Sequence, residues 1–246
     1  MSQQQNRPSS SHLGGVVTRT PASGVLSCYV RFAALGDSVT YGIRDNRPAG
    51  DRGWASLLAD AISKDHQMSF HKTARPGATA ADVRTAQLED ALAHRPHIAS
   101  LVVGLNDTMR STWDPAQVRA DLLYCAERLV EQGALLLTVR FHDHARVFGL
   151  PHVLARPMRA PVAILNEIYD EIYDRFGGVR VDLAAHPGVY DREFWSVDRL
   201  HPSELGHRVR ADEFAARLHH AGLLFDAPGL QLDGRSRAGS RTSSGW

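Results

Sequence analysis

Ser38 lies in the stretch "FAALGDSVTYG", residues 32–42, in which an apolar run ends at a glycine and is followed by an acid and a hydroxyl. A serine hydroxyl is a poor nucleophile at neutral pH and needs a base within hydrogen-bonding distance to become a good one. Two interpretations are open: Gly36-Asp37-Ser38 is a capped polar turn after a strand, or Ser38 is a nucleophile. In either case we expect Gly36 to permit a tight turn and the Asp37 carboxylate to bond neighbouring backbone.

A base and an acid that suit such a serine occur together in "DRLHP", residues 198–202. Asp198 lies three residues before His201, a spacing that can bring the carboxylate to Nδ1 of the imidazole. Nε2 is then free to accept the serine proton, and the carboxylate stabilises the imidazolium that forms. The alternative is that Asp198 caps a turn and His201 is an exposed loop histidine.

The stretch "GLNDT", residues 104–108, offers a side-chain amide after another apolar run. Asn106 there can direct an N–H group at the negative charge that develops when a nucleophile attacks a carbonyl carbon. Gly104 lets the backbone approach closely, and Asp107 is expected to support the turn beside Asn106. An ordinary Asn-Asp turn after a strand is the alternative.

The stretch "RPGAT", residues 75–79, adds a backbone donor. The N–H of Gly77 can point at the same oxyanion, together with the N–H of Ser38. This signal is weak by itself, because glycine is common in any loop.

The elements that must position these residues alternate along the chain. Apolar runs predict five strands, at 28–36, 68–74, 98–104, 134–140 and 179–185, and the third is continuous enough to be central. Apolar residues spaced three and four apart predict helices at 54–64, 81–94, 115–133, 161–178 and 203–222, the last capped by Ser203.

This alternation predicts an α/β protein with a parallel sheet and helices on both faces. In such sheets, sites form outside the carboxyl ends of the strands. Each candidate residue above follows a predicted strand or precedes the last predicted helix, so we expect all of them at that edge.

The bulk composition excludes several classes of function. The chain has 246 residues, 43% of them hydrophobic, with 28 basic and 27 acidic side chains and no basic stripe that would predict a nucleic-acid partner. No segment is apolar enough to be a transmembrane helix, and the first 28 residues lack the pattern of a secretory signal. With only two cysteines as well, the sequence predicts a cytoplasmic protein.

The domain organisation follows from composition. Residues 1–27 are rich in Ser, Gln, Pro and Gly, and residues 226–246 in Gly, Ser and Arg, so we predict two disordered tails. Between them we predict one domain, residues 28–225.

A cluster of histidines, His142, His144 and His152, lies in residues 141–160, a stretch without clear periodicity. His-x-His can bind zinc, but no cysteine or second histidine cluster completes a tetrahedral set, so we predict no metal site. These residues are expected to line a long loop after the fourth strand, and such loops often form lids or specificity walls. Residues 41–53 are a second candidate wall.

Taken together, the sequence resembles the SGNH (GDSL) hydrolase superfamily over about residues 30–220, with similarity to bacterial, especially actinobacterial, members. Its four blocks match "GDSVTYG", "ARPGATAAD", "GLND" and "DRLHP", in the family's order. The resemblance implies a flavodoxin-like three-layer α/β/α sandwich whose five-stranded parallel sheet has the order 2-1-3-4-5. It also implies that Ser38 is the nucleophile, His201 the base and Asp198 its orienting acid, with Ser38, Gly77 and Asn106 as oxyanion donors.

The resemblance makes an esterase or lipase acting on small-molecule acyl esters, without a cofactor, the first expectation. An acyltransferase that passes the same acyl-enzyme to another acceptor is the second. A non-catalytic binding module is a remote third, because a fold alone does not establish activity. A nucleotide-binding domain is weaker still, since neither a Gly-x-x-x-x-Gly-Lys nor a Gly-x-Gly-x-x-Gly motif follows the first strand.

Overall fold

The computed structural model describes residues 29–44, 47–48 and 53–222. The two predicted tails, at 1–27 and 226–246, lie outside the described residues, as does part of the candidate wall at 41–53. What is described of that wall includes a two-stranded antiparallel ribbon of β2 (Ile43–Arg44) and β3 (Arg47–Pro48).

The main sheet has five parallel strands in the order β4-β1-β5-β6-β7. The strands are β1 (Tyr29–Gly36), β4 (Gln67–Lys72), β5 (Ile98–Val102), β6 (Leu135–Arg140) and β7 (Val179–Asp182). This is the predicted order 2-1-3-4-5, with β5 at the centre. All five residues of β5 are buried, which explains its continuous apolar run.

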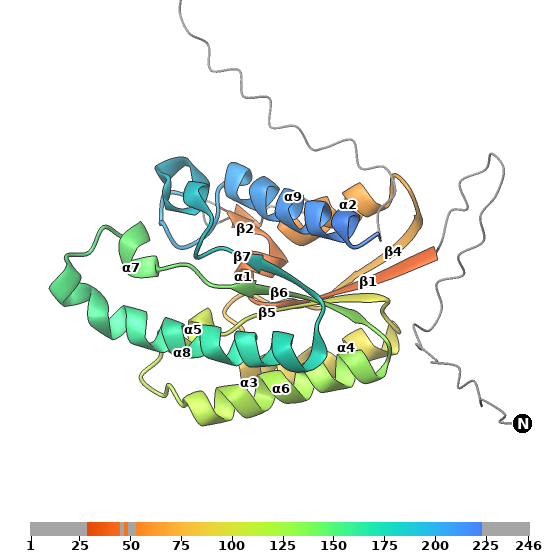
Figure 1. Ribbon diagram of the computed structural model, residues 1–246, viewed down its shortest axis with the longest axis horizontal. Helices are drawn as coiled ribbons and strands as arrows, with labels where there is room; N and C mark the ends of the chain where they lie inside the picture. The colour runs from red at the N-terminus through yellow and green to blue at the C-terminus, as the bar shows by residue number, and fades with distance from the viewer. Residues whose placement is uncertain (1–28, 45–46, 49–52, 223–246) are drawn as a thin grey trace, which may run out of the picture.

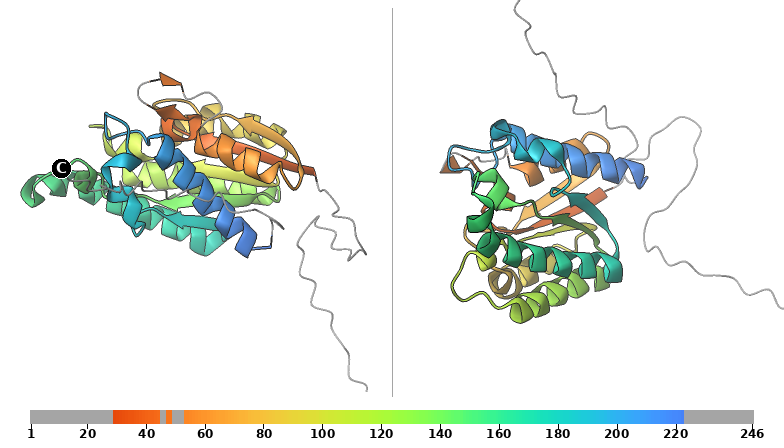
Figure 2. Two further views of the ribbon diagram at one scale, coloured as in Figure 1. Left: turned by 90° about the horizontal axis from the view of Figure 1, so that it is seen from above. Right: turned by 60° about the vertical axis from the view of Figure 1, so that its left-hand side comes forward.

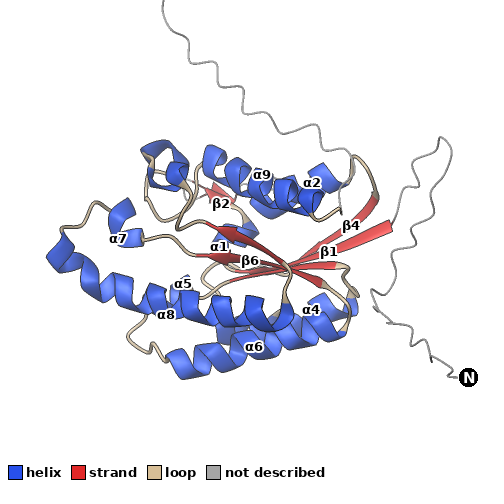
Figure 3. Ribbon diagram, in the orientation of Figure 1, coloured by secondary structure: helices blue, strands red, loops and turns tan. Residues whose placement is uncertain are grey.

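Helices cover both faces of the sheet (Figures 1 and 3). On one face lie α2 (Trp54–Ile62) and α9 (Glu204–His220). On the other lie α3 (Ala80–Ala86), α4 (Leu88–Ala93), α6 (Pro115–Glu131) and α8 (His152–Phe176). The predicted α/β/α sandwich is confirmed. In the part of the chain that the structure describes, no helix is both long enough and apolar enough to cross a membrane.

Side-chain caps fix where several of these helices begin. Thr79 forms a reciprocal capping box with Asp82 at the start of α3. Asp114 caps α6 and is followed by a proline at the first helical position. Ser203 accepts a hydrogen bond from the backbone N–H of Gly206 and caps α9, as its position in the sequence predicts.

Two predicted boundaries are wrong. The helix predicted at 81–94 is two helices, α3 and α4, separated at Gln87. Residues 141–160 are not one irregular loop: a short helix, α7 (His144–Val147), is followed by α8, which begins at His152 rather than at residue 161. The first turns of α8 contain two prolines and bury only Ala155 before Val162, so they lack the apolar period of a packed helix.

The first turns of α8 extend past the carboxyl edge of the sheet, as two perpendicular views show (Figures 1 and 2). The short helices α1 (Ser38–Tyr41) and α5 (Leu105–Thr108) lie nearer the body at the same edge. The 3-10 turns η2 (Pro187–Tyr190) and η3 (Arg192–Phe194) follow β7.

Three buried side chains each hold the backbone of the residue at which a strand leaves the sheet. Gln87 accepts from the N–H of Gly36 at 2.9 Å and donates to its carbonyl oxygen at 2.9 Å. The hydroxyl of Tyr169, on α8, accepts from the N–H of Val103 at 3.1 Å and donates to the Val103 carbonyl at 2.8 Å.

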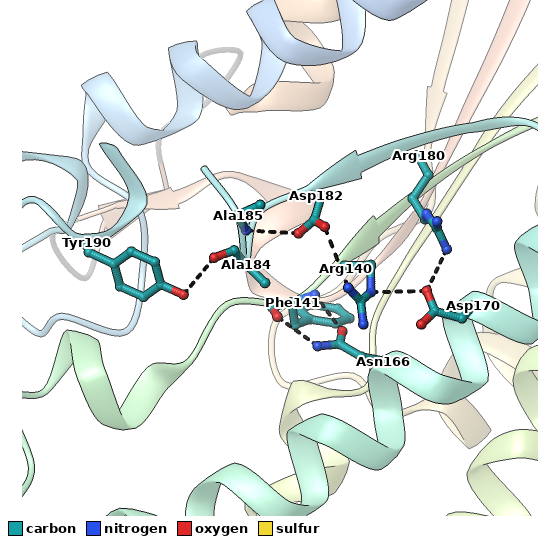
Figure 4. Close-up of polar contacts among 9 residues, drawn as sticks. All are labelled: Arg140, Phe141, Asn166, Asp170, Arg180, Asp182, Ala184, Ala185 and Tyr190. Carbon is teal, nitrogen blue, oxygen red and sulfur yellow. Dashed lines mark hydrogen bonds and ion pairs between the residues drawn. The ribbon is translucent and has the colours of Figure 1, made fainter. Parts of the chain in front are cut away.

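Asn166, also on α8, makes the third reciprocal pair with Phe141, accepting from its N–H at 2.7 Å and donating to its carbonyl at 2.9 Å (Figure 4). We call Gln87, Tyr169 and Asn166 the exit clamps. They satisfy backbone groups at the ends of β1, β5 and β6, where buried unpaired groups would be costly.

We expect Tyr169→Phe to lower the free energy of unfolding by about 2–4 kcal/mol, because the N–H and the carbonyl of Val103 both lose a buried partner. Denaturant unfolding measures this. Tyr124→Phe is the matched control, since the Tyr124 hydroxyl accepts only from Arg128 at a half-buried position, and it should cost less than about 1 kcal/mol. Equal effects of the two substitutions would contradict a clamp at Val103.

Candidate active site

Ser38 is the first residue of α1, directly after β1, and the residues before it fix that position. Gly36 has φ +155°, and a Cβ there would lie 2.5 Å from the carbonyl oxygen of Val102, so no other residue fits. The Asp37 carboxylate accepts from the N–H of Val39 at 3.0 Å and caps α1. Gly36 thus lies in a tight turn, and Asp37 bonds neighbouring backbone beside the serine.

The structure brings together the serine, the histidine and the aspartate that the sequence singled out. Ser38 Oγ lies 3.0 Å from His201 Nε2, although 163 positions separate the two residues. His201 Nδ1 lies 2.7 Å from Asp198 Oδ2. The arrangement allows the imidazole to accept the serine proton on one side while the carboxylate holds it on the other.

The loop that carries Asp198 and His201 is closed by its own hydrogen bonds. Asp198 Oδ1 accepts from the backbone N–H groups of Leu200 and His201, at 2.9 and 3.0 Å, so both carboxylate oxygens are engaged. Burial by itself raises the pKa of Asp198, but the hydrogen bonds from His201 and Leu200 outweigh it and hold this pKa below its usual value. Asp198 is therefore ionised across the neutral pH range.

Candidate hydrogen-bond donors lie in the turns after the two strands next to β1, which lies between β4 and β5. Gly77 follows β4 and Asn106 follows β5. Among the described residues, the N–H groups of Ser38 and Gly77 donate to no acceptor. Asn106 Nδ2 gives one hydrogen to the carbonyl of Ala78 at 2.9 Å, which leaves its second hydrogen available.

The turn that holds Asn106 is tied to the turn that holds Gly77. Asp107 accepts from the N–H of Ala80 at 3.1 Å, and burial raises the pKa of Asp107 to about 6. Arg110 Nη2 donates to the Gly77 carbonyl at 3.1 Å. Gly104 has φ +117°, which favours glycine, and this starts the turn.

A buried arginine lies beneath the serine turn. Arg210, on α9, is 3% exposed, and burial lowers its pKa to about 10, against the opposing charge of Asp37. Burial in turn raises the pKa of Asp37 to about 6, which its bond from Val39 and the positive charge of Arg210 moderate. The sequence gives no sign of Arg210, because an arginine on an amphipathic helix usually faces solvent.

His142 and His144 pack with Trp195 rather than lining an open loop. The two imidazole centroids are 4.2 Å apart, and that of His142 lies 4.6 Å from the Trp195 ring. Neither imidazole has a hydrogen-bond partner among the described residues. Within the same residues, no group of three or more His, Cys, Asp or Glu side chains could hold a metal ion. His152 is separate and exposed at the start of α8.

Ion pairs hold the ends of the strands next to this pair. Arg140, the last residue of β6, lies 3.1 Å from Asp170 on α8 and 3.6 Å from Asp182 on β7 (Figure 4). Asp170 also pairs with Arg180. Together with the Asn166 clamp, these contacts fix the direction in which the chain enters the His142 segment.

Gln87, Arg210 and Trp195 were not among the candidate residues that the sequence offers for this site. Trp195 is in the core, at 4% exposure, with Nε1 donating to the Val189 carbonyl at 2.6 Å. A Gln between apolar residues at helical spacing was the only available signal for Gln87. An inward-facing polar side chain in that pattern is a candidate clamp.

Burial keeps both imidazoles neutral: it lowers the pKa of His144 to about 4 and that of His142 well below its ordinary value, and Arg210 adds to both effects. Below pH 6.5 the unfolded chain therefore takes up protons on these groups that the folded protein does not. The stability that depends on neutral His144 is complete above pH 6.5 and is lost as the pH falls towards about 4, and His142 acts in the same direction. Asp37 and Asp107 act in the opposite sense as the pH falls through 6.

The free energy of unfolding of the wild type should fall between pH 7 and pH 5, in part because His144 takes up a proton only in the unfolded chain. We expect His144→Phe to make this fall smaller by about 2 kcal/mol. Denaturant unfolding of both proteins at the two pH values isolates this histidine, because the carboxyl groups contribute equally to each. His152→Phe, at an exposed position, controls for replacing a histidine. The same pH dependence in the wild type and His144→Phe would show that His144 is not buried in the neutral form.

The fold is shared with solved esterases. The lipase/acylhydrolase from Enterococcus faecalis is 19% identical, with a TM-score of 0.61 over 78% of this chain and 96% of that one. The acetylxylan esterase from Geobacillus stearothermophilus is 18% identical, with a TM-score of 0.63 over 79% and 96%. The psychrotrophic esterase from Pseudoalteromonas sp. is 13% identical, with a TM-score of 0.61 over 78% and 97%. At these identities the likeness shows the fold.

None of the curated proteins compared with the sequence matches it. The family model described as GDSL-like lipase/acylhydrolase matches residues 34–209, which run from the end of β1 into α9 and include Ser38, Gly77, Asn106, Asp198 and His201. The chain therefore belongs to the GDSL-like lipase/acylhydrolase family, a family of ester-cleaving hydrolases.

Proposed function

We propose that this protein is a serine-dependent ester hydrolase that works through an acyl-enzyme on Ser38. The observation that carries the proposal is the hydrogen-bonded series from Ser38 Oγ through His201 to Asp198, with distances of 3.0 and 2.7 Å. A capped turn and an exposed loop histidine, the alternatives for these fragments, give no reason for the two side chains to meet. Their meeting supports a shared chemical role.

In the first half of the reaction, Ser38 Oγ attacks the ester carbonyl carbon and its proton passes to His201 Nε2. The oxyanion that forms accepts hydrogen bonds from the N–H groups of Ser38 and Gly77 and from the second hydrogen of Asn106 Nδ2. The ester C–O bond then breaks, and His201 returns the proton to the departing alcohol.

In the second half, a water molecule attacks the acyl carbon while His201 accepts one of its protons. The bond to Ser38 Oγ breaks, the proton returns to Ser38, and the acid leaves. Asp198 stays ionised throughout and stabilises the imidazolium in both halves, in keeping with its lowered pKa. No cofactor or metal is needed for these steps.

We expect Ser38→Ala to reduce kcat for p-nitrophenyl acetate by at least about 10³-fold, because the nucleophile is lost. His201→Ala should be comparably damaging and Asp198→Ala less so. Ser63→Ala removes a hydroxyl from an exposed serine after α2 and should leave kcat unchanged.

Turnover by Ser38→Ala at the wild-type rate would rule out Ser38 as the nucleophile. Product analysis with an added alcohol separates two outcomes for the acyl group. Free acid as the main product supports the hydrolase, whereas conversion to the new ester at the expense of free acid would make the protein an acyltransferase.

Asn106 is tested separately, because its amide has one hydrogen committed to Ala78 and one available to the oxyanion. We expect Asn106→Ala to lower kcat by about 10²–10³-fold with a small change in KM, since the donor acts in the transition state. The thermal midpoint of the variant measures what the bond to Ala78 contributes to stability. An unchanged kcat with a lowered midpoint would assign Asn106 a structural role alone.

A further inference from the structure

Three segments at the carboxyl edge of the sheet, residues 103–114, 141–160 and 196–203, each expose a large apolar side chain within three residues of an exposed arginine. The pairs are Met109 (50% exposed) with Arg110, Val153 (83%) and Leu154 (64%) with Arg156, and Val197 (81%) with Arg199. We call these seven residues the apolar-basic rim. Apolar surface this exposed on several neighbouring segments indicates an interaction site.

The carboxylates of the same three segments are already engaged. Asp107 is buried against Ala80, Asp114 caps α6, Asp143 pairs with Arg159, and Asp198 holds His201. In contrast, none of the three rim arginines forms an ion pair with a described residue.

Two other groups of carboxylates are exposed after β7. Glu204 pairs with Arg208 on α9. Asp191 precedes η3 and Glu193 lies within it, so both are outside the three segments. The rim itself therefore presents apolar side chains and unpaired positive charge.

The middle pair lies on the part of α8 that extends past the sheet (Figures 1 and 2). In its first six residues only Ala155 is buried, so Val153 and Leu154 do not pack against the body of the protein. A helical segment with outward-facing apolar residues beside arginine is the composition of interfacial helices, whose apolar groups enter the headgroup region while the basic groups stay at its surface.

We propose that the apolar-basic rim docks on an anionic lipid surface, with the Ser38 edge of the sheet towards it. The apolar side chains lose contact with water, and the unpaired arginines meet lipid phosphates. Where the proposed esterase function holds, the substrate class is then an ester of a lipid presented at that surface.

A second copy of the chain fits the rim less well. A two-fold interface would bring the same patch against itself. The three arginines of the rim, which form no ion pair, would lie against the same patch of the other copy, and the three segments offer no free carboxylate to balance them. Anionic lipid supplies the missing negative charge.

The experiment is sedimentation with vesicles of phosphatidylcholine, with and without phosphatidylglycerol. The probe protein is Ser38→Ala, so that lipid cleavage does not alter the vesicles. We expect binding to the anionic vesicles that weakens as salt is added, because part of it is electrostatic. Adding Val153→Ser, Leu154→Ser and Arg156→Gln should weaken this binding by about 10- to 100-fold.

The matched control adds Tyr29→Ser and Arg95→Gln, which remove an exposed large side chain and an exposed arginine at the opposite, amino edge of the sheet. The control should bind as the Ser38→Ala protein does.

Absence of binding to anionic vesicles, or equal binding by the rim variant and the control, would overturn the proposal. A dimer in light scattering that the rim substitutions convert to monomer would assign the rim to a second copy. With Ser38 intact, the rim variant should hydrolyse soluble p-nitrophenyl acetate at the wild-type rate. Vesicle binding without any esterase activity would keep the docking surface and refute the proposed function instead.

Discussion

The site depends on where each strand stops. A parallel sheet holds its strands in register only while the ladder continues, and the residue that leaves the ladder has an N–H and a carbonyl to satisfy in a buried place. The exit clamps Gln87, Tyr169 and Asn166 each satisfy both groups of one such residue. Since the segments bearing Ser38, Asn106 and His142 begin within three residues of the clamped positions, the clamps set where those side chains start.

The pKa values of the ionisable groups beneath the serine turn are set mainly by burial. Asp37, Arg210, His142 and His144 are all buried, and burial is the main cause of the pKa shift of each. Neutral imidazoles beside Trp195 add no charge near the His201 loop, whereas Asp37 and Arg210 offset one another. Asp198 is the exception, because three hydrogen bonds from Leu200 and His201 keep it charged while it is partly exposed. The negative charge next to His201 is therefore the carboxylate of Asp198, which protein hydrogen bonds stabilise in its ionised form.

The sequence predicted the sheet order through a family resemblance, and strand positions through apolar runs, because both depend on repeated local patterns. The spacing of Asp198 and His201 likewise predicts contact within one loop. The role of Gln87 was not predicted, since the sequence pattern does not distinguish a polar side chain that points inward from one that points outward. The start of α8 at His152 was not predicted, because Val153 and Leu154 face outward and Pro157 and Pro161 are typical of helix boundaries. The direction of Gln87 depends on a tertiary contact with Gly36, and the first turns of α8 make too few tertiary contacts to leave an apolar pattern in the sequence.

The carboxyl edge thus combines two kinds of surface with opposite demands. The groups around Ser38 are held by buried hydrogen bonds, because a nucleophile and a base must keep a separation near 3 Å. The rim beyond them exposes Val153, Leu154 and Val197, whose burial within the chain would stabilise the fold. Burying these side chains would increase stability, and replacing them by polar residues would increase solubility. Their exposure beside unpaired arginines, at the edge where the chemistry lies, is most simply explained by a partner surface that is apolar and negatively charged.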